Sequence, residues 1–313
     1  MSKIFEALQR SVSERTGFPL SEAPDIATEL LQETERLHCS VAAAAEFPLP
    51  TEPSIAPEWL QEQAKPEGLR SCAKLVPSLT PESRVIAITD PGSVAAERFR
   101  LLAVRLRNLR QRRELKRVLI TSAVPDEGKS VVAVNLASTL ARYKQLRILL
   151  VEGDIRRPRI RTSLGLPAMK GLSEWLRSDV PASEVIYEVN PPEVKFWLLP
   201  AGEPLAEPLE LMQSGRLAAL MDNLSESFDL IIIDSTPILP VADTSFWARL
   251  SHGILMVVRE GKTEKRQLQK ALEAIEGSPL LGVVLNSCTN SEHKSYYTYY
   301  NGSQVETGSE QKK

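Results

Sequence analysis

Short apolar runs of strand length alternate with amphipathic helical segments through most of this sequence, and this alternation constrains the fold more than any other feature. Apolar strands separated by helices are typical of a parallel sheet that helices cover on both faces. We therefore expect an α/β fold of three layers, α/β/α, with a mainly parallel sheet. The expected strands are 117–123, 147–154, 195–202, 228–235, 253–261 and 280–286, and the main expected helices are 93–112, 130–144, 172–178 and 263–276.

The composition is that of a folded protein with one large domain and an extension. The chain has 313 residues, of which 42% are hydrophobic and 25% charged, so a packed core is expected. A net charge of −2 argues against nucleic acid as the main partner. The spacing of Cys39, Cys72 and Cys288 matches no metal or disulfide framework, which indicates a reducing compartment. With no apolar run near the length that spans a bilayer and no signal core at the N-terminus, we expect a cytoplasmic protein unless a partner recruits it to the membrane.

The first 80 residues differ from the rest, because they carry eight prolines. Two short amphipathic segments, 3–12 and 25–37, interrupt this region. The region could be a solvated extension, or its first helix could dock on a partner, and the sequence leaves both open. We expect four segments: a helical, partly disordered extension over 1–43, a Pro-rich linker over 44–82, the folded domain over 83–290 and a disordered tyrosine-containing tail over 291–313.

A phosphate-binding loop follows the first core strand. The stretch "AVPDEGKS" places Gly-Lys-Ser between an apolar strand and an amphipathic helix. In such a loop the main-chain N–H groups and the helix N-terminus form an anion site, the lysine contacts the β- and γ-phosphates, and the serine hydroxyl ligates Mg²⁺. The expected nucleotide-binding residues are Ala123, Val124, Pro125, Asp126, Glu127, Gly128, Lys129, Ser130 and Val131, with Asn286 after the last strand either touching the base or capping a turn.

Acidic residues end two further strands. Asp234 closes "LIIIDS", where a P-loop fold needs a carboxylate for Mg²⁺ or its water. Glu152 and Asp154 end "LLVEGD" on the neighbouring strand. Such acids can also be helix caps or solvated charges, but three of them meeting on one edge would be costly without a cation. We expect catalytic or metal roles for Asp234, Asp154 and Glu152.

The stretch "SYYTYYNG" near the C-terminus holds four of the six tyrosines: Tyr296, Tyr297, Tyr299 and Tyr300. The residues around them are polar and cannot build a core. Taken alone, the stretch could be a short capping strand or an adhesive aromatic tail.

From about residue 84 to residue 300 the chain resembles the bacterial tyrosine kinases of capsule and exopolysaccharide export, the BY-kinases. "TSAVPDEGKSVVAVNLA" is similar to the Walker A region of that family, "ILLVEGDIRRP" to its second acidic motif, and "FDLIIIDSTPILPVADT" to its Walker B region. "FWLLPAGEPLAEPLELM" and "GVVLN" also match in place and character. The resemblance implies a P-loop NTPase fold and an ATP- and Mg²⁺-dependent protein-tyrosine kinase.

The resemblance also implies roles for individual residues. Lys129 would stabilise charge on the transferring phosphoryl group, while Ser130, Asp154 and Asp234 would organise Mg²⁺. The carboxylate of Glu152 would accept the tyrosine proton, because a phenol with a pKa near 10 needs a base at neutral pH. The four tail tyrosines would be phosphoacceptors that a neighbouring copy modifies in trans, which requires self-association.

The family further implies partners outside this chain. A membrane chain-length-determinant protein supplies the activating cytosolic segment in the family, and it would here be a separate polypeptide that recruits the kinase to the inner face of the membrane. A cognate tyrosine phosphatase is expected as well.

Three positions depart from the family pattern. Glu152 stands where the family usually has Asp, and Asp126 stands where the loop usually has Gly, so that a negative charge lies near the phosphates. The ring-forming motif Glu-x-x-Arg-x-x-Arg reads Glu97, Arg100 and then Ala103, which puts a ring of subunits in doubt.

Two other functions remain open. A degenerate kinase would bind ATP and regulate the export machinery without transferring phosphate. A partition or division-site ATPase would share the fold, but its signature lysine would fall at Val124. The basic run "RNLRQRRELKR" is expected to be a solvated helix face, or else a surface for a membrane or an acidic segment.

Overall fold

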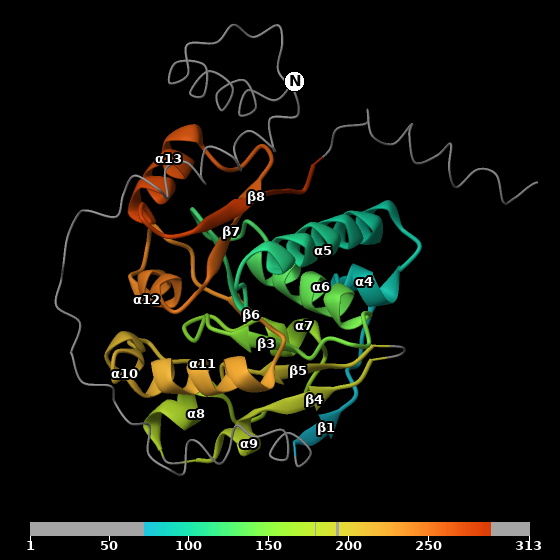
Figure 1. The fold of residues 1–313 in the computed structure, drawn as a ribbon, viewed down its shortest axis with the longest axis vertical. Helices are drawn as coiled ribbons and strands as arrows, with labels where there is room; N and C mark the ends of the chain where they lie inside the picture. The colour runs from blue at the N-terminus through green and yellow to red at the C-terminus, as the bar shows by residue number, and fades with distance from the viewer. Residues whose placement is uncertain (1–71, 179, 192–193, 289–313) are drawn as a thin grey trace, which may run out of the picture.

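The computed structural model describes residues 72–178, 180–191 and 194–288, and its centre is one sheet of eight strands (Figure 1). The strand order is β1-β4-β5-β3-β6-β2-β7-β8. All neighbouring strands run parallel except β4 and β5, which are antiparallel. The strands are β1 (Ala73–Leu75), β2 (Arg117–Ser122), β3 (Ile148–Glu152), β4 (Tyr187–Val189), β5 (Phe196–Leu199), β6 (Leu230–Asp234), β7 (Gly253–Arg259) and β8 (Leu280–Asn286). The predicted α/β class with a mainly parallel sheet is confirmed.

Helices cover the sheet on both faces, and a separate hydrophobic cluster fills the space under each layer. One layer contains α4 (Ile86–Thr89), α5 (Val94–Arg112), α6 (Lys129–Ala141) and α7 (Ile160–Ser163), with the 3-10 turn η2 (Pro81–Ser83) before it. The other contains α8 (Leu172–Arg177), α9 (Ala182–Val185), α10 (Leu209–Met212), α11 (Arg216–Ser227), α12 (Asp243–Arg249) and α13 (Lys265–Ala274). Among these described helices, none has the length and apolar character needed to cross a bilayer.

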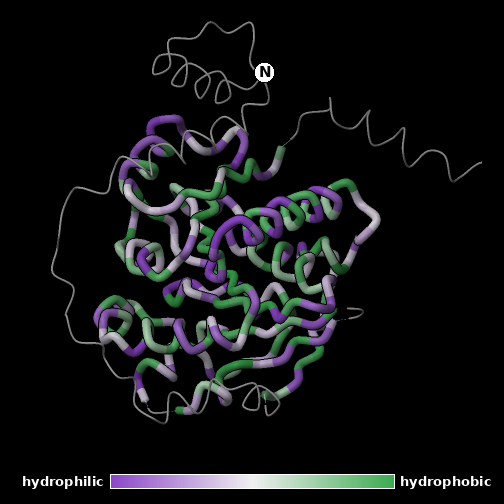
Figure 2. Tube along the Cα trace, in the orientation of Figure 1, coloured by the Kyte–Doolittle hydropathy of each residue, from purple (hydrophilic) through white to green (hydrophobic). Residues whose placement is uncertain are grey.

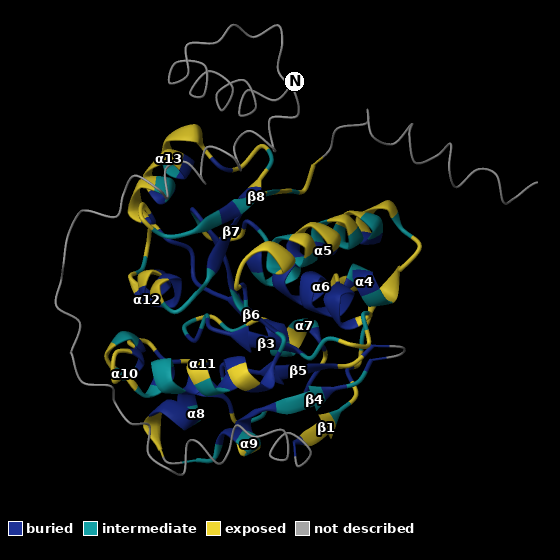
Figure 3. Cartoon of the chain, in the orientation of Figure 1, coloured by how far each residue is buried: buried dark blue, intermediate teal, exposed yellow. Residues whose placement is uncertain are grey.

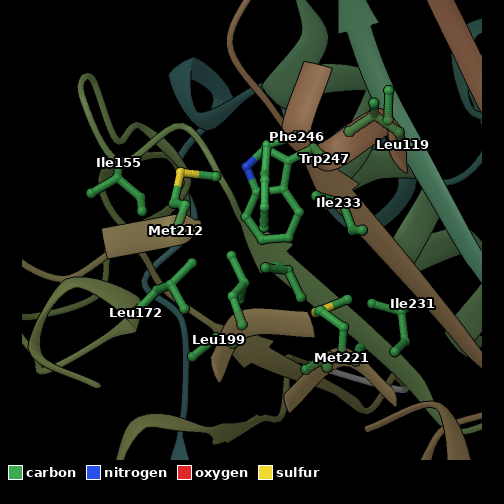
Figure 4. Packing of buried hydrophobic residues seen from close by; sticks show 14 of the residues in the cluster. Leu119, Ile155, Leu172, Leu199, Met212, Met221, Ile231, Ile233, Phe246 and Trp247 are labelled. Carbon is green, nitrogen blue, oxygen red and sulfur yellow. The ribbon is translucent and has the colours of Figure 1, made fainter. Parts of the chain in front are cut away.

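The apolar character of the central strands explains the two clusters. Successive side chains of a strand point to opposite faces. On β6, Leu230 and Ile232 therefore join the cluster under α5 and α6, while Ile231 and Ile233 join the one under α11 and α12. Figure 2 shows the hydrophobic residues along these strands, and Figure 3 shows that the same strands are buried. Figure 4 shows Ile231 and Ile233 in the cluster under α11 and α12. Burying each such side chain contributes about 1.5–3 kcal/mol.

Helix α5 carries the sequence that departs from the family's ring-forming motif. Ser93 caps the helix, since its hydroxyl accepts a hydrogen bond from the Ala96 N–H at 3.1 Å. Glu97 and Arg100 form the expected i,i+3 ion pair on the surface. Ala103 is fully buried in the cluster between α5 and the sheet. A long charged side chain has no room at position 103, so the missing arginine reflects how this helix packs.

The first strand lies inside the segment for which the sequence predicts a Pro-rich linker. Ala73–Leu75 pairs in parallel with β4, so that Ala73 stands opposite Tyr187. The sheet therefore includes residues that precede position 83. A three-residue strand whose first two side chains are exposed has too little apolar pattern to be recognised in sequence.

Candidate phosphoryl-transfer site

The phosphate-binding loop joins β2, in the middle of the sheet, to the start of α6. Gly128 adopts a left-handed conformation with φ of 93°, and α6 begins at Lys129. A side chain at position 128 would collide with Asn286, whose amide donates a hydrogen bond to the Glu127 carbonyl at 2.8 Å. Glycine is thus required both by the turn and by this close approach. Of the two sequence hypotheses for Asn286, the structure supports a bracing role, because the side chain contacts the loop from the end of β8.

Glu127 holds the loop in shape from inside. Its side chain is fully buried, and one carboxylate oxygen accepts a hydrogen bond from the Val124 N–H at 2.9 Å. The other oxygen accepts one from the Thr263 hydroxyl, which lies just before α13. The side chain of Glu127 is therefore engaged within the protein, and any contact of this residue with a nucleotide would use its main chain.

Asp126 lies at the exposed tip of the loop with φ of 63°, a conformation that favours glycine. Its carboxylate lies 3.8 Å from the Arg159 guanidinium and 3.9 Å from the Lys262 ammonium. Arg259 also donates to its carbonyl at 3.2 Å. The negative charge near the phosphates, which the sequence identified as unfavourable, is thus flanked by cations from two other loops.

Asp234 ends β6 in a fully enclosed position. It is 1% exposed, and neither carboxylate oxygen has a hydrogen-bond partner of normal geometry among the described residues. Burial raises its pKa to about 7, although the Lys129 ammonium and the Ser130 hydroxyl lie close enough to oppose the rise. A buried carboxylate without a well-formed hydrogen bond is costly, so a further cation beside Lys129 would stabilise the charged form of Asp234.

Glu152 ends β3 opposite Asp234 in the sheet register, but its carboxylate is fully engaged. One oxygen accepts a hydrogen bond from the Ile160 N–H at 2.6 Å, at the start of α7, and the other from the Ala201 N–H at 3.1 Å. Burial raises its pKa against the effect of these amides. Main-chain amides therefore occupy both carboxylate oxygens of Glu152, and its function as the general base stays a prediction.

Asp154 is the more accessible acid of this strand end. One oxygen accepts a hydrogen bond from the Arg157 N–H at 3.0 Å, and the other makes none with the described residues. Burial raises its pKa, while the Arg157 N–H and the Lys129 charge lower it. Asp154 thus has a free oxygen within the electrostatic reach of Lys129.

The loop that carries Asp154 is fixed to the neighbouring strand end and to α12. Gly153 donates to the Asp234 carbonyl at 2.7 Å, and a side chain at this position would strike Trp247. Arg156 forms a two-pronged ion pair with Asp243, with distances of 2.6 and 3.1 Å. Asp243 is 1% exposed. Arg156 is therefore a structural partner of a buried acid.

The remaining predicted residues lie at the same edge or beyond the described chain. Ala123, Val124, Pro125 and Val131 belong to the loop and the first turn of α6, as predicted. Tyr296, Tyr297, Tyr299 and Tyr300 lie outside the described residues, and so do the predicted segments over 1–43 and 291–313.

The site fits a magnesium ion that arrives with a nucleotide. Among the described residues, no group of three or more His, Cys, Asp or Glu side chains could hold a metal ion alone. Mg²⁺ is usually bound through one or two carboxylates together with substrate phosphates. The enclosed oxygens of Asp234, next to the hydroxyl of Ser130, satisfy that requirement.

A central parallel strand, a Gly-Lys-Ser loop opening a helix and a buried aspartate on the adjacent strand together define the P-loop class of nucleotide-binding proteins. A comparison with models of known protein families found no match. Individual proteins do match. The chain is 34% identical over 221 residues to the tyrosine-protein kinase YwqD of Bacillus subtilis, covering 70% of this chain and 92% of that protein. The chain belongs to the bacterial tyrosine-protein kinase family.

Two further similarities extend this result. The succinoglycan biosynthesis transport protein ExoP of Rhizobium meliloti is 34% identical over 219 residues, covering 67% of this chain and 27% of that protein. The kinase domain of the Escherichia coli tyrosine kinase ETK superimposes with a TM-score of 0.59 at 25% identity, covering 66% of this chain and 82% of that one.

Proposed function

We propose that this protein is an ATP-dependent protein-tyrosine kinase that acts in capsule or exopolysaccharide production. The observation that carries the proposal is the enclosed carboxylate of Asp234, which lies near Lys129 and Ser130 of the Gly-Lys-Ser loop and makes no hydrogen bond of normal geometry with the described residues. Membership of the tyrosine-kinase family and the similarity to a succinoglycan transport protein support the reaction and its setting.

The loop residues and the neighbouring acids have separate roles in phosphoryl transfer. The main-chain N–H groups of the loop and the start of α6 hold the phosphates, and Lys129 offsets charge on the γ-phosphoryl group. Ser130 and Asp234 would hold Mg²⁺, which when bound neutralises phosphate charge and orients the nucleotide. Asp154, which the resemblance also offers as a magnesium ligand, is assigned below to the phenolic proton. Transfer then forms a bond from phosphorus to the phenolic oxygen, breaks the β–γ bridge and releases ADP.

The phenol must lose its proton during this step. Both oxygens of Glu152 are held by main-chain amides, while Asp154 keeps one free oxygen and a raised pKa. A raised pKa makes a carboxylate a better acceptor for a phenolic proton. We therefore assign proton acceptance to Asp154 and orientation of its loop to Glu152.

The acceptors in this proposal are Tyr296, Tyr297, Tyr299 and Tyr300. Phosphorylation in trans requires that two copies of the chain associate. A membrane protein of the chain-length-determinant type would activate and recruit the kinase, and a tyrosine phosphatase would reverse the modification.

The test is a phosphotyrosine immunoblot of the purified full-length chain after incubation with Mg·ATP. Wild-type protein should give an ATP-dependent signal, and Lys129→Met should abolish it, whereas the matched surface variant Lys265→Met should keep it. Replacing all four tail tyrosines by phenylalanine should remove most of the signal. An ATP-independent or absent signal in the wild type contradicts the proposal.

A degenerate kinase is the second candidate, and Asp126 is the observation that favours it. A carboxylate at the exposed tip of the loop opposes phosphate binding. Isothermal titration separates the two candidates: saturable Mg·ATP binding without any phosphotyrosine signal indicates a nucleotide-binding regulator.

A further inference from the structure

Two basic segments meet on one surface of the domain. Residues 107–117 and 142–147 contain nine Lys and Arg residues and a single acidic residue, Glu114, in a chain with a net charge of −2. We call the surface formed by these two segments the basic surface. Nothing in the proposed kinase reaction uses it.

Contacts between the two segments show that they form one surface. The carboxylate of Asp229 lies 3.5 Å from the Arg110 guanidinium and 3.6 Å from that of Arg147. The guanidinium of Arg107 lies 4.0 Å from the centre of the Tyr143 ring. The C-terminal half of α5 and the turn between α6 and β3 are therefore side by side.

The basic surface lies at the opposite edge of the sheet from the phosphate-binding loop. β2 begins at Arg117 and ends next to the loop, and the parallel strand β3 begins directly after Arg147. The amino ends of these strands, the end of α5 and the end of α6 therefore share this edge. A partner bound here leaves the nucleotide site open.

Neighbouring acids neutralise only part of the charge. Asp229 is shared by Arg110 and Arg147, and Asp222 pairs with Arg117. Three side chains are exposed and make no ion pair or hydrogen bond with the described residues: Arg112, Arg113 and Lys144.

We propose that the basic surface binds the anionic headgroups of a lipid bilayer. Headgroup binding requires a density of positive charge and no matching shape. A protein partner would normally require an apolar centre. Among the described residues, segments 107–117 and 142–147 contain no exposed large hydrophobic side chain. Val94, Leu101 and Val104 lie on the preceding turns of α5, and Val76, Leu239, Val283 and Leu285 lie on other segments.

The experiment is sedimentation of the nucleotide-free full-length protein with vesicles. One set contains phosphatidylglycerol and phosphatidylcholine in roughly equal parts, and the other contains phosphatidylcholine alone. The test variant is Arg112→Ala/Arg113→Ala/Lys144→Ala. The matched control is Lys265→Ala/Arg266→Ala/Lys270→Ala, which removes the same charge from exposed positions on α13.

The wild type and the control should bind the anionic vesicles, and binding should weaken as salt is added. The test variant should lose affinity by about fivefold per charge removed. Unchanged thermal unfolding would confirm that the test variant folds, since all three side chains are exposed.

Three results would overturn the proposal. They are equal binding by test and control variants, equal binding to neutral vesicles, and binding of the basic surface to poly-glutamate or duplex DNA without binding to vesicles. The phosphotyrosine assay is independent of all three, so the kinase proposal and this one can fail separately.

Discussion

Glu152 and Asp234 occupy equivalent places on neighbouring strands and yet differ in what surrounds them. They stand opposite each other in the register of β3 and β6, and each is 1% exposed. Two main-chain N–H groups satisfy Glu152, whereas Asp234 has none. Depth of burial therefore does not distinguish a structural acid from a candidate metal ligand. The two acids differ instead in the hydrogen-bond donors around their carboxylates.

The sharpest test of this comparison is Asp234→Asn. Loss of the carboxylate should lower the rate of tyrosine phosphorylation at least about 100-fold, because the group proposed to hold Mg²⁺ is gone. The metal-free protein should keep or gain stability, because burial disfavours the charged form of Asp234 and an amide at this position carries no charge. Radiolabel transfer from ATP and thermal unfolding measure the two effects. Asp222→Asn, an exposed acid at the far edge, serves as the control.

Glu152→Gln and Asp154→Asn test which acid takes the proton. If Asp154 is the base, its amide variant should lose about 10²- to 10⁴-fold in transfer rate. Glu152→Gln should instead lose about 1–3 kcal/mol of unfolding free energy, because one main-chain N–H then faces an amide NH₂ group. Single-turnover rates and denaturant unfolding of both variants give the answer. A larger rate loss in Glu152→Gln would return the base role to that residue.

The raised pKa of Asp234 predicts how the stability of the metal-free protein depends on pH. The folded state holds this proton up to about pH 7, while the unfolded chain releases it near 3.8. Between these values the native state binds more protons, so this group makes stability fall with rising pH by about 1.4 kcal/mol per unit. Unfolding curves from pH 5.5 to 7.5 should therefore slope more steeply downward in the wild type than in Asp234→Asn. Parallel curves would contradict the assigned pKa.

Asp126→Gly should have the smallest effect. Glycine removes the strain of the left-handed backbone at position 126, and it removes a negative charge near the phosphates. Arg159 and Lys262 already offset that charge, so the effect should be small. We expect the Kd for Mg·ATP to fall about two- to fivefold, as is usual for exposed charges. Asp126→Asn removes the charge and keeps a residue that tolerates this backbone, so titrating both variants separates the two causes. Weaker binding in both would mean that Asp126 supports the site.

The parts of the fold and site that could be predicted from sequence are those with local signals. Central strands such as β6 are continuous apolar runs, and Gly-Lys-Ser follows the apolar strand β2 after a loop of five residues. Asp234 was found because parallel strands end at a shared edge. The sequence does not predict the short antiparallel strand β4, because three residues are too few to show a clear alternation of apolar and polar side chains.

The contacts that set the roles of the acids were beyond prediction because they join distant parts of the chain. The bond between Thr263 and Glu127 spans 136 positions, and the pair of Arg156 with Asp243 spans 87. No local pattern predicts the hydrogen bond from the Ala201 N–H to Glu152. Ala201 follows β5, and it reaches Glu152 because β5 pairs with β3 in the sheet. The sequence thus predicts which residues gather at the site. It does not predict which of their side chains already make hydrogen bonds or ion pairs within the protein.

Asn286 joins the phosphate-binding loop to the strand at one edge of the sheet. Its amide donates a hydrogen bond from the end of β8 to the Glu127 carbonyl at 2.8 Å, next to the left-handed turn at Gly128. A shift of β8 would therefore also move this turn, so the edge strand and the phosphate-binding loop are mechanically coupled.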